Sequence, residues 1–175
     1  KNNSLIANGI VTYSADGTPS TVADALGHAT VASNWKRGSP QTVSYPDGSS
    51  ESAVIDDNGW MTSTTGRNSD TTSYQYDPMG RLARIVWPSA DTVAWNDTII
   101  DFSPVGANEY GIPSGHWRQA VSMGDLRKVT YFDALWQPLV SESFDARSPA
   151  ATLSQVLRRF DTMGRPRYES YPTRN

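Results

Sequence analysis

The sequence predicts an all-β fold of antiparallel hairpins with little or no helix. Thr, Val, Tyr, Trp and Ile gather in short runs, which 13 Gly and 11 Pro, together with Asn, Asp and Ser, interrupt. This pattern is typical of many short strands joined by tight turns. An Asp followed three residues later by Gly recurs along the chain, which indicates a repeating unit.

The repeating unit has the chemistry of a hairpin turn. An Asp at its first position accepts hydrogen bonds from backbone N–H groups two or three residues on. Gly at its fourth position suits the left-handed residue that closes a type I turn with a bulge. We expect turns near residues 24–27, 56–59, 77–80, 133–136 and 161–164, built by Asp24, Gly27, Asp56, Gly59, Tyr76, Asp77, Gly80, Arg81, Phe132, Asp133, Phe160, Asp161, Gly164 and Arg165.

The flanking segments predict the strands. Residues 73–76 and 81–87 flank the third turn, and residues 129–132 and 139–144 flank the fourth, so each pair predicts an antiparallel hairpin. Trp136 stands where the other copies have Gly, so this turn either holds Trp at an unfavourable φ or has another geometry, which we expect. Residues 150–157 are either a helix entered through Ser148 and Pro149 or a loop leading to a strand at 156–160.

The copies are irregularly spaced within what we expect to be a single array over residues 1–175. The interval between the third and fourth copies holds an insertion at about residues 89–128. This insertion is a candidate closing element for the sheet, and a separate function would reside there.

Composition excludes several classes of function. The net charge is −3 with acidic and basic residues interspersed, which argues against nucleic acid and a polybasic membrane contact. The chain has no Cys, so disulfides and thiolate metal sites are excluded. No apolar run reaches the roughly 18 residues of a membrane span. We expect no cofactor and no metal; the Asp-rich residues 56–59 lack the further carboxylates of a calcium loop, so we interpret them as a turn.

The segment 74–82, Tyr-Gln-Tyr-Asp-Pro-Met-Gly-Arg-Leu, resembles the YD (tyrosine-aspartate) repeats of the RHS family, and residues 159–166 resemble them more weakly. This family includes bacterial polymorphic toxins, insecticidal toxin complexes and animal teneurins. The resemblance, over roughly residues 10–172, implies a sheet that curves and spirals into a shell around a C-terminal effector or toxin domain, which this sequence lacks. It also implies a larger exported parent, secreted or at the cell surface, whose further repeats cover the open sheet edges; otherwise these edges would self-associate.

We therefore expect a non-enzymatic structural segment. The two histidines are His28, beside a turn, and His116, which would need a pocket shared with a distant carboxylate to act in a hydrolase. The alternative is an adhesive module that binds a cell-surface glycan or a protein, because aromatic rings stack on sugars. The candidate contacts are Trp35, Lys36, Arg37, Trp117 and Arg118, unless these aromatics serve only to fill the shell or to pair across strands.

Overall fold

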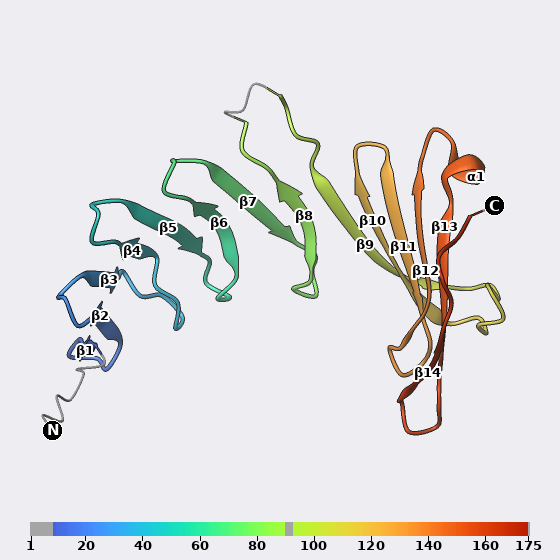
Figure 1. Cartoon of the computed structure of the whole chain (residues 1–175), viewed down its shortest axis with the longest axis horizontal. Coiled ribbons are helices and arrows are strands. Elements are labelled where there is room, and N and C mark those ends of the chain that lie inside the picture. The colour runs from blue at the N-terminus through green and yellow to red at the C-terminus, as the bar shows by residue number, and fades with distance from the viewer. Residues whose placement is uncertain (1–8, 90–92, 175) are drawn as a thin grey trace, which may run out of the picture. The chain divides into compact units, whose positions relative to one another are not determined.

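The computed structural model describes residues 9–89 and 93–174 (Figure 1). Within these residues the chain forms 15 strands and one helix, α1 (Pro149–Thr152). Strands β1 to β14 lie side by side in chain order, and β15 pairs antiparallel with β13. The predicted all-β antiparallel fold with little helix is confirmed. The chain divides into two compact units: the first holds the described residues up to Gly80 and those of Val86–Trp95, and the second holds Arg81–Ile85 and the described residues from Asn96 onward.

The first unit is a meander of short strands. Its strands are β1 (Ile10–Tyr13), β2 (Pro19–Ala23), β3 (Ala29–Ser33), β4 (Thr42–Ser44), β5 (Ser50–Ile55), β6 (Met61–Thr65) and β7 (Thr71–Tyr76). Side chains alternate between the two faces of a sheet. Val31 lies opposite both Thr21 and Ser44, and Ser44 lies opposite Ser50, so these four residues share one face. Val54 is an even number of residues from Ser50 and lies on that face, whereas Val22, next to Thr21, lies on the other. Among the described residues of this unit, only Ile55 is buried.

The second unit has longer strands and a small core. Its strands are β8 (Leu82–Val86), β9 (Thr98–Val105), β10 (His116–Met123), β11 (Leu126–Phe132), β12 (Pro138–Asp145), β13 (Ser154–Phe160), β14 (Pro166–Glu169) and β15 (Thr173–Arg174). Ile112, Tyr131 and Val140 are buried together, and Val129, Leu139 and Leu157 pack against them. Ile112 comes from the connection between β9 and β10, so this connection covers one face of the sheet.

The predicted insertion at about residues 89–128 contains an ordinary pair of strands. β9 and β10 pair along their whole length, from Thr98 opposite Met123 to Val105 opposite His116. Residues 90–92 of the insertion lie outside the described residues. Near residue 150 we expected either a helix or a loop leading to a strand, and each describes part of the segment. α1 is a single helical turn, and β13 begins soon after it, at Ser154.

Candidate functional site

The same turn connects many of the strands. In eight turns of the described residues, the N–H of the fourth residue donates to the carbonyl oxygen of the first, and the fourth residue has a φ between 64° and 91°. At Asp161, for example, the Gly164 N–H lies 2.9 Å from the Asp161 oxygen, and the Asp161 N–H donates to the Arg165 oxygen at 3.0 Å. The first residues of the eight turns are Ser14, Asp24, Tyr45, Asp56, Gly66, Asp77, Asp133 and Asp161.

The aspartates at the first position are bound by the turn backbone. Their Oδ1 atoms accept the N–H of the third residue at 2.8–2.9 Å, as at Met79 and Met163. The backbone N–H of His28 lowers the pKa of Asp24 most, and the hydrogen bond from the His28 side chain lowers it further. The backbone N–H and then the side chain of Arg165 lower the pKa of Asp161 in the same way. Burial raises the pKa of Asp56, but the hydrogen bonds led by the Trp60 N–H outweigh it and lower the pKa overall. The carboxylates of Asp24, Asp56 and Asp161 therefore stabilise their turns in the ionised form.

Three of the eight turns escaped the sequence analysis because their first residue is not Asp. In the turns that begin at Ser14 and Tyr45, the Asp stands at the third position, where Asp16 and Asp47 accept hydrogen bonds from the residue two further on. The Asp-Gly dipeptide, a strong hairpin signal, would have found both. The third turn carries Ser69 at φ 66°, which no such signal marks.

The geometry expected at Trp136 is wrong. Trp136 adopts φ 64°, and its N–H donates to the Asp133 oxygen at 3.1 Å, so this turn has the same form as the others. A left-handed conformation costs a residue with a Cβ about 1–2 kcal/mol. The Trp136 ring stacks on Phe102 with 5.3 Å between ring centroids, and it also contacts Trp117 and Phe132. These contacts offset the backbone strain.

In the first unit, the turn between β5 and β6 contacts the turn that follows β7. Trp60, the fifth residue of one turn, covers Gly80 of the next, where an added Cβ would lie 2.5 Å from Trp60 Cζ2. Tyr76 packs on Trp60 with 5.2 Å between ring centroids, and its hydroxyl donates to the Met61 carbonyl at 2.7 Å. Tyr76, the aromatic residue before Asp77, therefore holds this repeat against the one that precedes it.

The second unit repeats part of this contact. Gln137, the fifth residue of its turn, covers Gly164, where an added Cβ would lie 3.0 Å from Gln137 Nε2. Figure 1 shows the β11–β12 and β13–β14 turns at the same end of their strands. In each unit, the fifth residue of one turn covers the fourth residue of a later turn. The contact between turns therefore has a direction along the array.

An aromatic cluster lies beside these turns on the face of the second unit opposite its core. It consists of Phe102, Trp117, Phe132 and Trp136, and the Phe102 and Trp117 rings stack at 5.1 Å. The Arg81 guanidinium carbon lies 4.8 Å from the Phe102 ring centroid, a cation–π contact. Trp136 leaves 53% of its surface exposed, so the cluster is accessible to a ligand.

The structure separates the five candidate ligand contacts. Trp35 donates its indole N–H to the Pro19 carbonyl at 3.1 Å, and Lys36 pairs with Asp57 at 2.9 Å. Arg37 lies against Gly59, because a Cβ added to Gly59 would lie 3.4 Å from Arg37 Cβ. Trp117 belongs to the aromatic cluster. Arg118, its neighbour in β10, points to the other face, where it lies 3.6 Å from Glu109.

A buried polar network lies under the connection between β9 and β10. Glu142 accepts hydrogen bonds from the Tyr110 hydroxyl, from the Tyr131 hydroxyl at 3.3 Å and from Gln155 Nε2 at 2.9 Å. Burial is the main cause that raises the pKa of Tyr110, and its hydrogen bond to Glu142 adds to the effect. Burial is also the main cause that raises the pKa of Tyr131, and the negative charge of Glu142 comes second. Both phenols therefore remain donors at neutral pH, and the network fixes the connection to the sheet.

His116 lies in the same region. Its Nδ1 lies 2.9 Å from the Pro113 carbonyl oxygen, and its Nε2 lies 3.3 Å from Glu109 Oε2. The imidazole is buried, and both partners come from the adjoining connection. The carboxylate beside His116 is thus local in sequence and holds a loop, whereas a hydrolase would require a carboxylate from a distant segment in an open pocket.

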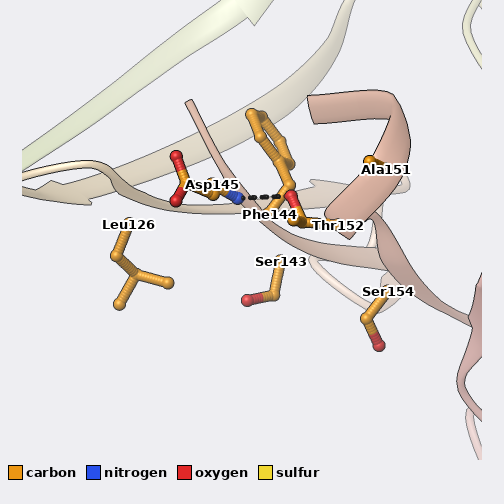
Figure 2. Close-up of a pocket in the computed structure, with 7 residues that line it drawn as sticks. All are labelled: Leu126, Ser143, Phe144, Asp145, Ala151, Thr152 and Ser154. Atoms are coloured by element: carbon orange, nitrogen blue, oxygen red, sulfur yellow. Dashed lines mark hydrogen bonds between the residues drawn. The ribbon is translucent and has the colours of Figure 1, made fainter. Parts of the chain in front are cut away.

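A hollow of the second unit lies beside α1 (Figure 2). The Asp145 N–H donates to Thr152 Oγ1 at 2.9 Å, and the Asp145 carboxylate accepts the Arg147 N–H at 2.7 Å. The remaining lining is Leu126, Phe144 and Ala151 with the hydroxyls of Ser143 and Ser154. The one carboxylate here is engaged in a local turn, so the hollow reflects how α1 packs on β12.

The array of hairpins with shared turns is a repeat protein of the all-β class. Residues 56–88 match the family model described as RHS Repeat. The chain therefore contains an RHS repeat, and this repeat spans the Trp60–Tyr76–Gly80 contact. A search of curated proteins found no match.

A chain in the solved structure of the Photorhabdus luminescens Tc holotoxin pore is similar to this one. The similarity covers 95% of this chain and 12% of that chain, at 11% sequence identity and a TM-score of 0.31. Within the described residues, no helix is long and apolar enough to cross a membrane.

Proposed function

We propose that this chain is a structural segment of an RHS-type protein, forming part of a curved β-wall that encloses or displays a C-terminal effector domain. The supporting observation is how little the first unit buries. Val22 and Val54 lie on opposite faces, yet 51% and 54% of their surfaces are exposed. A sheet normally buries at least one apolar face against another layer. Further polypeptide must therefore cover this sheet, as a wall around a cargo would require.

The turns fit this structural role. Their carboxylates bind backbone N–H groups, and their aromatic residues join successive hairpins, so the repeated residues serve the array itself. The proposal assigns no catalytic residue. Its partners are further RHS repeats and the effector domain of a larger exported protein that is secreted or displayed at the cell surface.

Cysteine labelling tests the wall. The chain has no Cys, so Val22→Cys and Val54→Cys each introduce one thiol, on opposite faces. Both should react with maleimide in the isolated chain. In a polypeptide that also carries the further repeats and the effector domain, one face lines the interior, and its thiol should react at least tenfold more slowly. Leu26→Cys, in an exposed turn, is the control and should react equally in both. Equal rates for all three thiols in the larger polypeptide would refute enclosure.

A second candidate function is adhesion to a glycan through the aromatic cluster. Beside the cluster, Gln119, Thr130 and Ser141 lie opposite one another on three neighbouring strands, and their side chains share the face of Trp117. Aromatic rings suit the apolar face of a sugar ring, and neutral hydrogen-bonding groups beside them suit its hydroxyl groups.

Ligand-observed NMR with a panel of neutral oligosaccharides tests adhesion. Binding should be lost in Trp136→Ala and retained in Trp35→Ala, whose indole is engaged by the Pro19 carbonyl. Binding that survives Trp136→Ala would exclude the cluster as the site, and no binding by the unaltered chain would exclude adhesion to these glycans.

A further inference from the structure

The face that carries the aromatic cluster continues along the strands of the second unit to the hollow beside α1. On β10 and β11, Trp117 lies opposite Phe132, and Val121 lies opposite Lys128. Four residues separate these two pairs on each strand, so both pairs lie on the same face. On β12, Ser143 lies opposite Lys128, and Ser143 also lines the hollow. The aromatic cluster and the hollow are therefore the two ends of one surface.

Neutral hydrogen-bonding groups line this surface between its two ends. One row crosses the strands beside the aromatic cluster, and a second row crosses them beside the hollow. The first row is Gln119, Thr130 and Ser141, and in the second row Ser143 lies opposite Ser154. Ser141 Oγ accepts a hydrogen bond from Arg158 at 2.9 Å, which leaves the Ser141 O–H to donate. Such groups suit the hydroxyl groups of a sugar.

The surface has no excess of charge at its strand positions. On β9–β12, which the structure describes throughout, this face carries one cation, Lys128, and one carboxylate, Asp145. Lys128 is exposed, and the Asp145 carboxylate accepts the Arg147 N–H at 2.7 Å. This balance of charge favours a neutral ligand over an acidic or a basic polymer.

We propose that a neutral, linear oligosaccharide lies along this surface, parallel to the strands, with one end stacked on the aromatic cluster and the other in the hollow. The site extends the glycan adhesion proposed above and rests on it. From Phe132 to Leu126, which lines the hollow, six residues of β11 span about 20 Å at about 3.4 Å each. This length exceeds a single sugar and matches a chain of several.

The hollow has the size and the lining of a subsite for the far end of this chain. Its volume is about 380 Å³, which lies within the range of small-molecule sites. The Ser143 and Ser154 hydroxyls offer polar contacts, and Leu126, half of whose surface is exposed, offers an apolar one (Figure 2). The two ends of the surface thus each combine apolar side chains with neutral polar groups.

Calorimetric titration with a length series tests the site. The probes are oligomers of β-1,4-linked glucose and of β-1,4-linked N-acetylglucosamine, from the single sugar to the hexamer. In at least one series the affinity should rise with each added sugar until the chain spans about 20 Å, and then stay constant. Trp136→Ala should weaken the binding of every oligomer, because it removes an exposed ring of the aromatic cluster.

A variant that fills the hollow tests its far end. Ala151 lines the hollow from α1, so Ala151→Trp should weaken the binding of the hexamer about fivefold or more and leave the shortest oligomers unchanged. Ala150→Trp is the matched control, because Ala150 is the preceding residue of the same helical turn and lies outside the lining. It should leave every oligomer unchanged. Circular dichroism should show the same fold for both variants.

The outcomes separate this site from the adhesion on which it rests. If no oligomer of either series binds, both are wrong. If short oligomers bind and added sugars bring no gain, or if Ala151→Trp leaves the hexamer unchanged, the aromatic cluster binds a glycan but the surface and the hollow do not. If oligomers of galacturonic acid bind more tightly than the neutral oligomers of the same length, the ligand is acidic and the assigned class is wrong.

Discussion

Replacing Gly80 by Ala separates the two demands that the repeat places on the fourth residue of its turn. Gly80 has φ 81°, and an added Cβ would lie 2.5 Å from Trp60 Cζ2. Gly48 offers a matched control in the same unit, because its φ is 84° but nothing lies within 4 Å of an added Cβ. The difference between the two substitutions therefore measures the contact between turns.

The expected magnitudes follow from these two distances. The left-handed conformation alone costs Ala about 1–2 kcal/mol, which is the loss of unfolding free energy expected for Gly48→Ala. Gly80→Ala adds the cost of forcing Trp60 aside, about 1–3 kcal/mol for an overpacked site. At about 3 °C per kcal/mol for a chain of this size, Gly48→Ala should lower the Tm by about 3–6 °C and Gly80→Ala by about 6–15 °C.

Urea unfolding followed by circular dichroism measures both losses, and a double-mutant cycle assigns the difference. Trp60→Leu in the Gly80→Ala background should recover about 1–3 kcal/mol relative to the sum of the single effects, since the smaller side chain makes room for the new Cβ. In the Gly48→Ala background the two effects should add. Equal losses for Gly80→Ala and Gly48→Ala, with no coupling to Trp60, would refute the role of the turn contact.

Three further predictions concern the turns. Tyr76→Phe removes a hydroxyl that donates to the preceding repeat and should lower the unfolding free energy by about 0.5–1.5 kcal/mol, while Tyr171→Phe, on an exposed side chain, should change nothing in the same urea titration. Trp136→Gly relieves φ strain worth about 1–2 kcal/mol but removes the aromatic stack, so the Tm should still fall; a rise would show that strain dominates. Asp24 and Asp161 have lowered pKa values in the fold, so their stabilisation is present above the unfolded value of about 3.9 and is lost as the pH falls through the folded value. Thermal melts should show the Tm dropping below about pH 4, with a smaller drop in Asp161→Asn.

Local chemistry made the turns predictable. Asp at the first position and Gly at the fourth each have a reason that holds within a few residues, so the Asp-x-x-Gly pattern located turns at residues 24–27, 56–59, 77–80 and 161–164. The turn that begins at Gly66 escaped because Ser69 adopts its positive φ without a residue type that favours it. At Trp136 the same local rule gave the wrong geometry, since contacts with Phe102 and Trp117, distant in sequence, outweigh the backbone preference.

The sequence by itself determined the antiparallel hairpins, the chemistry of their turns and the resemblance to YD repeats, because these depend on residues close together in the chain. Only the tertiary structure decided which turns touch, where Trp60 and Gln137 cover glycines some 20 or more residues further on. It also decided that Trp117 and Arg118 serve opposite faces, and that Glu142 and His116 lie buried beneath a connection. These facts depend on strand register, and register is set by the sum of many turns rather than by any single motif.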